Sequence, residues 1–184
     1  MRIQWWTMKS IAGVPHQAAH GGEGRIEHSP KHLPKTRLAS FSPDFKEVQV
    51  TGRMELTDLV TSGLTRQGFY ASKRLLDVLI QHRLQPHQVY DANLFFNGEP
   101  VSGYSFIHLP GELFEFPDGP IPEVENWVAS HPVVCDLDLV RNNRPARYAY
   151  CFVSKQLRRF IEHHKLTGIR FGTSKLFRTK REHE

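Results

Sequence analysis

FYASKRL, at Phe69–Leu75, recurs as CFVSKQL at Cys151–Leu157, so that the serine at 72 returns at 154, 82 positions later. The match extends into the next turn, where HRL corresponds to HKL at the same offset. Each copy is typical of a short apolar strand followed by a serine N-cap and an amphipathic helix. We therefore predict a duplicated strand–helix unit, with helices capped by Ser72 and Ser154.

The hydrophobic residues of each predicted helix lie on one stripe. In the first helix the stripe consists of Leu75, Leu76, Leu79 and Ile80, and in the second it consists of Leu157, Phe160 and Ile161. Such a stripe packs against a sheet, and the strands around the helices supply one. We expect each helix to run for about three turns.

Two alternating apolar segments, residues 89–96 and 104–109, predict a β-hairpin. The Asn97-Gly98 dipeptide between them is the strongest short hairpin signal, because both turn positions need a positive φ. A further strand is predicted at residues 133–140. Strands and helices in this order predict an α+β (mixed α/β) fold, with both helices packed on a central twisted sheet.

Residues 1–47 are expected to form a loop-rich, irregular N-terminal arm. Four prolines and the run HGGEG interrupt this region, which has few aliphatic residues. Residues 48–184 are predicted to form a single α+β domain that ends in a basic tail. The arm also contains four histidines, which we interpret as solvated because no cysteine, helix or carboxylate partner accompanies them. They are His16, His20, His28 and His32.

The composition predicts a globular protein of the cytoplasm. With 184 residues, of which 39% are hydrophobic, the chain can bury about 70% of its unfolded surface. No apolar run approaches the roughly 20 residues of a membrane span, and residues 1–10 lack the apolar stretch of a signal peptide. Two cysteines, Cys135 and Cys151, make no disulfide framework, which fits a reducing compartment.

The net charge of +5 conceals three blocks of different sign. Residues 1–84 hold twelve Lys or Arg against seven Asp or Glu, and residues 141–184 hold twelve against three. Residues 85–140 contain nine acidic residues and no Lys or Arg. Because clustered charge of one sign steers partners of the opposite sign, we expect this acidic block to form a negative patch.

Catalytic chemistry has little support in the sequence. Asp136 and Asp138 share one face of a predicted strand and could hold Mg²⁺, but no third ligand is fixed, which favours a solvated strand face. Either cysteine could act as a nucleophile with His131 or His108 as its base, although no dedicated motif accompanies them. No P-loop, dinucleotide-binding or zinc motif is present. We expect no enzyme activity, no cofactor and no metal.

A basic helix and tail favour an alternative function, that of a nucleic-acid-binding accessory protein. Their side chains can neutralise phosphates. These residues are Lys155, Arg158, Arg159, Lys165, Lys175, Arg178, Lys180 and Arg181. The acidic block and the lack of a recognition-helix or stacking motif argue against this alternative.

Six short motifs occur in order along residues 48–172. They read DLVTSG at 58–63, FYASKRL at 69–75, LQPHQVY at 84–90, YSFIHL at 104–109, FVSKQL at 152–157 and TGIRF at 167–171. In this combination the chain resembles an immunity-protein family of bacterial polymorphic toxin systems, formerly a domain of unknown function. The motifs describe caps, turns and core aromatics of a scaffold. Their scaffold positions are Ser72, Leu75, His87, Tyr90, Tyr104, His108, Ser154 and Leu157.

The resemblance implies a cytoplasmic antitoxin that binds one cognate toxin domain, often a nuclease, and blocks its active site or its substrate. It does not specify contact residues. Because nucleases present basic clefts, the acidic, proline-rich connection is our candidate toxin-binding surface. Its acidic residues are Glu112, Glu115, Asp118, Glu123 and Glu125. A toxin with an acidic surface would instead meet the basic C-terminal face.

Overall fold

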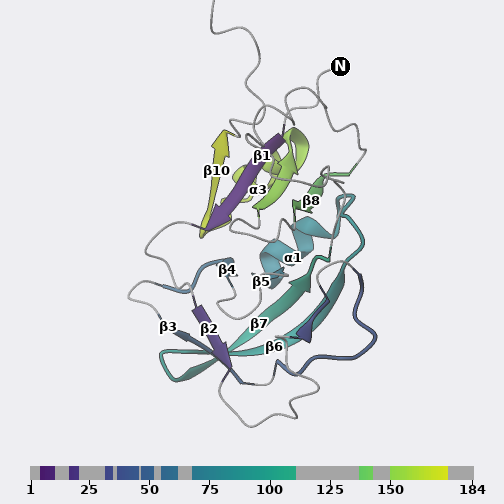
Figure 1. The fold of residues 1–184 in the computed structure, drawn as a ribbon. Coiled ribbons are helices and arrows are strands. Elements are labelled where there is room, and N and C mark those ends of the chain that lie inside the picture. Colours follow the sequence, from purple (N-terminus) through teal and green to yellow (C-terminus); the bar gives the residue numbers. More distant parts are fainter. Residues whose placement is uncertain are drawn as a thin grey trace, which may run out of the picture.

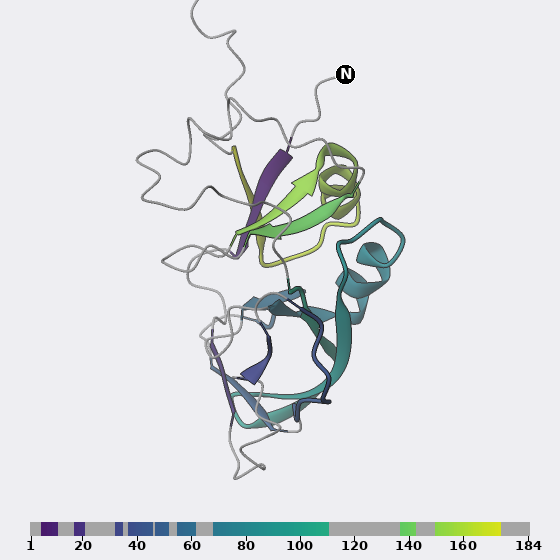
Figure 2. The same cartoon turned by 45° about the vertical axis from the view of Figure 1, so that its right-hand side comes forward.

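Over the residues that it describes, a computed structural model shows two β-sheets and two α-helices, an α+β fold (Figure 1). It describes residues 5–10, 17–20, 32–34, 37–45, 47–51, 55–61, 68–110, 137–142 and 150–173. Every structural statement below concerns these residues. Both helices lie on the same side of the molecule and contact each other (Figure 2).

The larger sheet is mixed and has six strands in the order β2-β3-β6-β7-β5-β4. Its strands are β2 (Gln17–His20), β3 (Val48–Thr51), β4 (Leu59–Thr61), β5 (Gly68–Ser72), β6 (Gln88–Phe96) and β7 (Glu99–His108). Only the β3–β6 pair is parallel among the described pairs of this sheet. Asn97 and Gly98 join β6 to β7 with φ values of 52° and 90°, which confirms the predicted hairpin.

The smaller sheet has four antiparallel strands in the order β10-β1-β9-β8. They are β1 (Trp5–Ser10), β8 (Leu139–Asn142), β9 (Tyr150–Ser154) and β10 (Ile169–Thr173). Helix α1 (Lys73–Leu79) follows β5, and helix α3 (Lys155–His163) follows β9. In the described part of the chain, no helix is long and apolar enough to cross a membrane.

Helix α1 is shorter than the sequence suggested. Its seven residues make about two turns, where we expected three. The helix ends at Leu79 because the chain then turns, which brings Leu84 beside Leu139 in an isolated parallel bridge.

The N-terminal segment corrects the expectation of an irregular arm over residues 1–47. Trp5–Ser10 is a central strand, hydrogen-bonded on one side to β9 and on the other to β10 (Figure 1). Gln17–His20 is also a strand and pairs with β3. Local sequence patterns do not reveal β1, because its partners lie far along the chain; Trp6, for example, is opposite Val153 and Thr173.

The two sheets repeat one arrangement. The neighbour order β6-β7-β5-β4 in the larger sheet has the same form as β10-β1-β9-β8 in the smaller sheet. Ile107 on β7 is opposite both Phe69 and Val89, and Met8 on β1 is opposite both Cys151 and Phe171. The steps from 69 to 151 and from 89 to 171 are both 82, the offset of the sequence repeat. We call β4, β5, α1, β6 and β7 the first unit, and β1, β8, β9, α3 and β10 the second unit. Strand β1 of the second unit takes the place that β7 takes in the first.

One hydrophobic core is shared by both sheets and both helices. It includes Met8 from β1, Leu75 from α1, Ile107 from β7 and Leu157 from α3. A second core lies on the other face of the larger sheet, around Tyr70, Phe106, Val48 and Phe45. Successive residues of β5 and β7 thus point into different cores, as the period of a strand requires.

Candidate functional site

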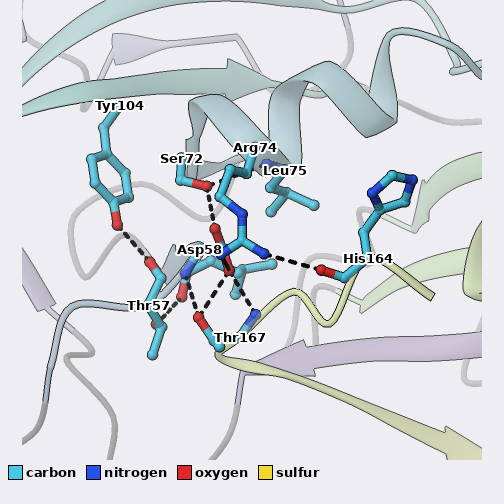
Figure 3. A network of polar contacts seen from close by, with 9 residues as sticks. Thr57, Asp58, Ser72, Arg74, Leu75, Tyr104, His164 and Thr167 are labelled. Atoms are coloured by element: carbon cyan, nitrogen blue, oxygen red, sulfur yellow. Dashed lines mark hydrogen bonds and ion pairs between the residues drawn. The ribbon is translucent and has the colours of Figure 1, made fainter. Parts of the chain in front are cut away.

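Ser72 begins helix α1 and also binds a carboxylate (Figure 3). Its side-chain oxygen accepts a hydrogen bond from Leu75 N at 3.2 Å, as an N-cap does, and its hydroxyl donates to Asp58 Oδ1 at 2.6 Å. The backbone forms a second link, because Ser72 N donates to Asp58 O at 2.8 Å. The hydroxyl therefore holds Asp58, the residue that precedes β4, against the start of the helix.

The other oxygen of Asp58 reaches the second unit. Oδ2 accepts from Thr167 N at 2.7 Å and from Thr167 Oγ1 at 2.9 Å, while Asp58 N donates to Thr167 Oγ1 at 3.1 Å (Figure 3). Arg74 Nη1 lies 3.6 Å from Oδ2, and Arg74 Nη2 donates to His164 O at 3.0 Å. This carboxylate, which is 5% exposed, thus joins α1 to the loop that follows α3.

The second unit repeats this arrangement around Ser154 and Asp138. Ser154 Oγ accepts from Leu157 N at 3.2 Å and donates to Asp138 Oδ1 at 2.6 Å, and Ser154 N donates to Asp138 O at 2.8 Å. Asp138 Oδ2 accepts from Arg83 N at 3.1 Å, in the loop that follows α1. Each unit therefore holds its own helix with one carboxylate oxygen and the other unit's loop with the second.

Asp138 corrects the prediction of a solvated strand face. Its side chain is 13% exposed, and besides its bonds to Ser154 and Arg83 it lies 3.5 Å from His82 Nδ1. Its partner in that prediction, Asp136, lies outside the described residues. The described residues contain no group of three or more His, Cys, Asp or Glu side chains that could hold a metal ion.

Hydrogen bonds govern the ionisation of Asp58. Burial raises the pKa of this carboxyl group, but hydrogen bonds from Ser72 and Thr167, together with the charge of Arg74, outweigh burial and lower it below its ordinary value. The carboxylate therefore stays charged and acts as an acceptor, which suits a structural junction rather than general acid catalysis.

Asp58, Ser72 and Thr167 form the junction between the units, and Tyr104 lies beside it. The hydroxyl of Tyr104 donates to Thr57 O at 2.8 Å. Burial, with the charge of Asp58, raises the pKa of Tyr104 to about 12. We expect the contribution of Tyr104 to the free energy of unfolding to be complete below pH 10. It should be lost between about pH 10 and 12, because only the unfolded state loses the tyrosine proton in that range. In Tyr104→Phe this part of the alkaline loss should be absent.

Urea unfolding at pH 8, 10 and 11 measures the alkaline loss, and absorbance at 295 nm follows tyrosine ionisation. At pH 8 the variant should be about 1 kcal/mol less stable, the usual value of one hydrogen bond. Equal alkaline losses in wild type and variant would contradict the assignment.

Gly168, beside Thr167, lets the two units approach closely. Its φ is +76°, and a Cβ there would lie 2.6 Å from Thr57 Cβ and 2.9 Å from Leu59 O. We expect Gly168→Ala to lower the free energy of unfolding by about 2–4 kcal/mol, from backbone strain and overpacking together. Denaturant unfolding measures this loss.

Gly98→Ala is the matched control, since Gly98 has φ +90° and open space around its Cβ position. It should lose only the strain, about 1 kcal/mol. Equal losses in the two variants would show that the units are not in close contact at Gly168.

The buried histidine of β7 is fixed by hydrogen bonds. His108 Nε2 lies 2.9 Å from Pro34 O, and Nδ1 lies 3.2 Å from Gln88 Oε1. Gln88 in turn accepts from Ala39 N at 2.7 Å and donates to Ala39 O at 3.0 Å. Burial and the charge of Arg141 lower the pKa of His108, while the bond to Pro34 raises it, with a net lowering. His108 therefore anchors the segment that precedes β3.

The remaining motif positions pack or form hydrogen bonds within the fold. Leu75 and Leu157 are fully buried in the shared core. His87 Nδ1 lies 2.9 Å from Gln85 O. Tyr90 packs against Phe45, with 5.7 Å between ring centres, and its buried hydroxyl has no hydrogen-bond partner among the described residues.

A buried polar pair across the two units escaped the sequence analysis. Arg141 N donates to Gln85 Oε1 at 2.6 Å, and Gln85 Nε2 donates to Pro110 O at 2.6 Å. Burial lowers the pKa of Arg141 to about 10 and raises the pKa of the neighbouring Cys151 thiol. A thiol held protonated in this way is a poor nucleophile.

The candidate toxin-binding residues lie outside the described residues. These are Glu112, Glu115, Asp118, Glu123 and Glu125. The same holds for Cys135, His131 and the histidines at 16 and 28, and for the basic tail from residue 174. The structure does fix where the acidic connection leaves the fold and returns, because Gln85 binds Pro110 O and Arg83 O accepts from Asp138 N at 2.5 Å.

The two aspartates of the junction had a signal in the sequence. Both begin the tripeptide DLV, at residues 58–60 and 138–140. These copies are 80 positions apart rather than 82, so a comparison at one fixed offset does not align them.

The chain matches no protein-family model and none of the curated proteins.

Proposed function

We propose that this chain is an immunity protein that binds and neutralises a cognate bacterial toxin domain, in the cytoplasm and without catalysis of its own. The observation that carries the proposal is the location of the motifs that resemble the immunity family. Ser72, Ser154 and Thr167 form the junction between the units, while Leu75 and Leu157 lie in the core. Such motifs preserve a scaffold, which leaves surface segments for recognition of the toxin.

The two halves derive, in this proposal, from one duplicated strand–helix unit with a Ser-capped helix. The shared offset of 82, the equivalent strand order and the matching Ser–Asp pairs support this origin. A rigid duplicated scaffold suits a stoichiometric inhibitor, because a binding surface on rigid elements loses little conformational entropy on association.

The acidic connection between β7 and β8 is the proposed toxin-contacting segment. Both of its ends are held by neighbouring residues of one short loop, Gln85 at Pro110 and Arg83 at Asp138. Carboxylates presented from a firmly anchored base could enter the basic cleft of a nuclease and give fast, salt-sensitive association.

Co-expression tests the function. The C-terminal domain encoded beside this gene, as the candidate toxin, is expressed in a bacterial host, with and without this chain, and surviving cells are counted. Rescue supports the immunity function, whereas a lethal domain without rescue contradicts it for that pair. A variant with Glu115, Asp118 and Glu123 all changed to Lys should associate at least about tenfold more slowly. An unchanged association rate and salt dependence would exclude the acidic connection as the contact.

A further inference from the structure

Helix α3 has one buried row of side chains and three rows that face away from the core. Leu157 and Ile161 form the buried row. Arg158 and Glu162 form an ion pair of 2.8 Å, and Arg158 also lies over the ring of Phe171. The remaining two rows lie at the i, i+4, i+8 spacing that aligns side chains on one helix face.

The first of these rows is cationic. Lys155, Arg159 and His163 are all exposed, and at a rise of about 1.5 Å per residue they extend over roughly 12 Å. Neither Lys155 nor Arg159 has a hydrogen-bond or ion-pair partner within the described segments. The equivalent lysine of α1, Lys73, is instead neutralised by Asp77 at 2.9 Å.

The second row is aromatic and borders α1. Phe160 is 39% exposed and stacks on His164, with 6.3 Å between ring centres. Phe160 also packs edge to face with His82, in the turn after α1, with 4.8 Å between ring centres. Ile80 at the end of α1 is 60% exposed. Of the four large hydrophobic residues exposed in the described part of the chain, one therefore lies on α3 and another at the end of α1.

We infer that α3 and the end of α1 form a docking surface for an acidic, partly apolar patch of a protein partner. This inference rests on the proposed function, in which the partner is the toxin domain, and it adds a surface distinct from the acidic connection. Unneutralised Lys155 and Arg159 would pair with carboxylates of the partner, while apolar groups would cover Phe160 and Ile80. Exposed arginine beside an aromatic ring is typical of residues that dominate interface energetics.

A protein fits this surface better than a nucleic acid does. The two cations that lack a partner within the described segments would give few phosphate contacts, so binding of this surface to DNA would be weak at physiological salt. The exposed side chains of Phe160 and Ile80 gain from apolar coverage, which a phosphate backbone does not supply.

The chain supplies a matched pair of variants. Arg159→Glu/Phe160→Ala alters the proposed surface, and Arg37→Glu/Leu38→Ala alters an exposed Arg followed by an exposed apolar residue elsewhere. Leu38 is 44% exposed, and the next residue, Ala39, is bound to Gln88 of the larger sheet. Arg159→Glu alone, at an exposed position, serves if the loss of Phe160 disturbs folding.

The experiment measures the Kd of the candidate toxin, the purified C-terminal domain encoded beside this gene, at 150 mM salt by titration calorimetry, with circular dichroism as the folding control. We expect the Arg159/Phe160 variant to bind about 30-fold more weakly or worse, and the Arg37/Leu38 variant to bind like wild type. Wild-type affinity in both variants would overturn the docking surface and leave the immunity function standing. No binding by the wild type would overturn both.

Two further outcomes would assign the surface to another partner and overturn the inference. In one, the wild type binds a 20-base-pair duplex and the Arg159/Phe160 change abolishes this binding without affecting the toxin domain. In the other, light scattering shows a dimer that the same change dissociates, again with toxin binding intact.

Discussion

Asp58→Ala is expected to lower the free energy of unfolding by about 3–5 kcal/mol, because removal of this buried carboxylate leaves several donors without an acceptor. Three donors lose the carboxylate as their acceptor, namely Ser72 Oγ, Thr167 N and Thr167 Oγ1, and Arg74 loses its nearest anion. Equilibrium unfolding in urea measures the loss. A loss under about 1 kcal/mol would show that the junction is not a principal source of stability.

Two controls separate the functions of the two carboxylate oxygens. Ser72→Ala removes the helix cap and the bond to Oδ1, and should cost about 1–2 kcal/mol. A double-mutant cycle between Asp58→Ala and Thr167→Val measures the coupling across the two units, which we expect to exceed about 0.5 kcal/mol. Additive losses would indicate that the contact with Thr167 contributes nothing specific.

Acid should weaken the same junction. Because the folded pKa of Asp58 is lowered, its contribution is complete above the unfolded pKa of about 3.9 and is lost as the pH falls through the folded value. Asp58→Asn should therefore unfold with a flatter pH dependence than wild type below about pH 4. An identical acid limb would contradict the ionised state assigned to Asp58.

Thr7→Pro is expected to unfold the half of the protein built on the smaller sheet, at a cost of at least about 3 kcal/mol. Thr7 is opposite Phe152 on one side and Gly172 on the other, so proline removes a ladder hydrogen bond from a central strand. Urea unfolding gives the cost, and amide hydrogen exchange should show larger losses in β9 and β10 than in β6 and β7.

Thr7→Val is the control, since valine keeps the amide and favours strands; its stability should stay within about 1 kcal/mol of wild type. Tolerance of proline at residue 7, with wild-type protection of β9 and β10, would mean that β1 does not complete the smaller sheet.

Local signals in the sequence predicted the parts of the fold that neighbouring residues determine. The Ser-Lys-x-Leu repeat located the starts of both helices, and Asn97-Gly98 located the hairpin, because a cap or a tight turn depends on a few adjacent residues. Strand β1 could not be located in this way. Its six residues acquire a strand conformation through partners about 150 positions away, and proline-rich sequence follows it.

The junction was only partly predictable for the same reason. The sequence predicted the caps, but the bonds between Asp58 and Thr167 span 109 positions. No local pattern indicates that the loop after α3 will meet the residue that precedes β4. The buried side chain of Gln85, which binds the backbone at Pro110 and Arg141, belongs to the same class, because glutamine is more common at the surface.

The position of β1 also bears on how the protein is made. A ribosome adds roughly 5–20 residues per second, so the N-terminal strand is synthesised on the order of 10–30 s before β10, with which it must pair. The first unit can pair β5, β6 and β7 while the chain is still growing, since these strands are close in sequence. The second unit cannot close until β10 has been synthesised. A nascent chain that stops before β10 would thus lack the complete smaller sheet, and in the proposed function it would confer no immunity.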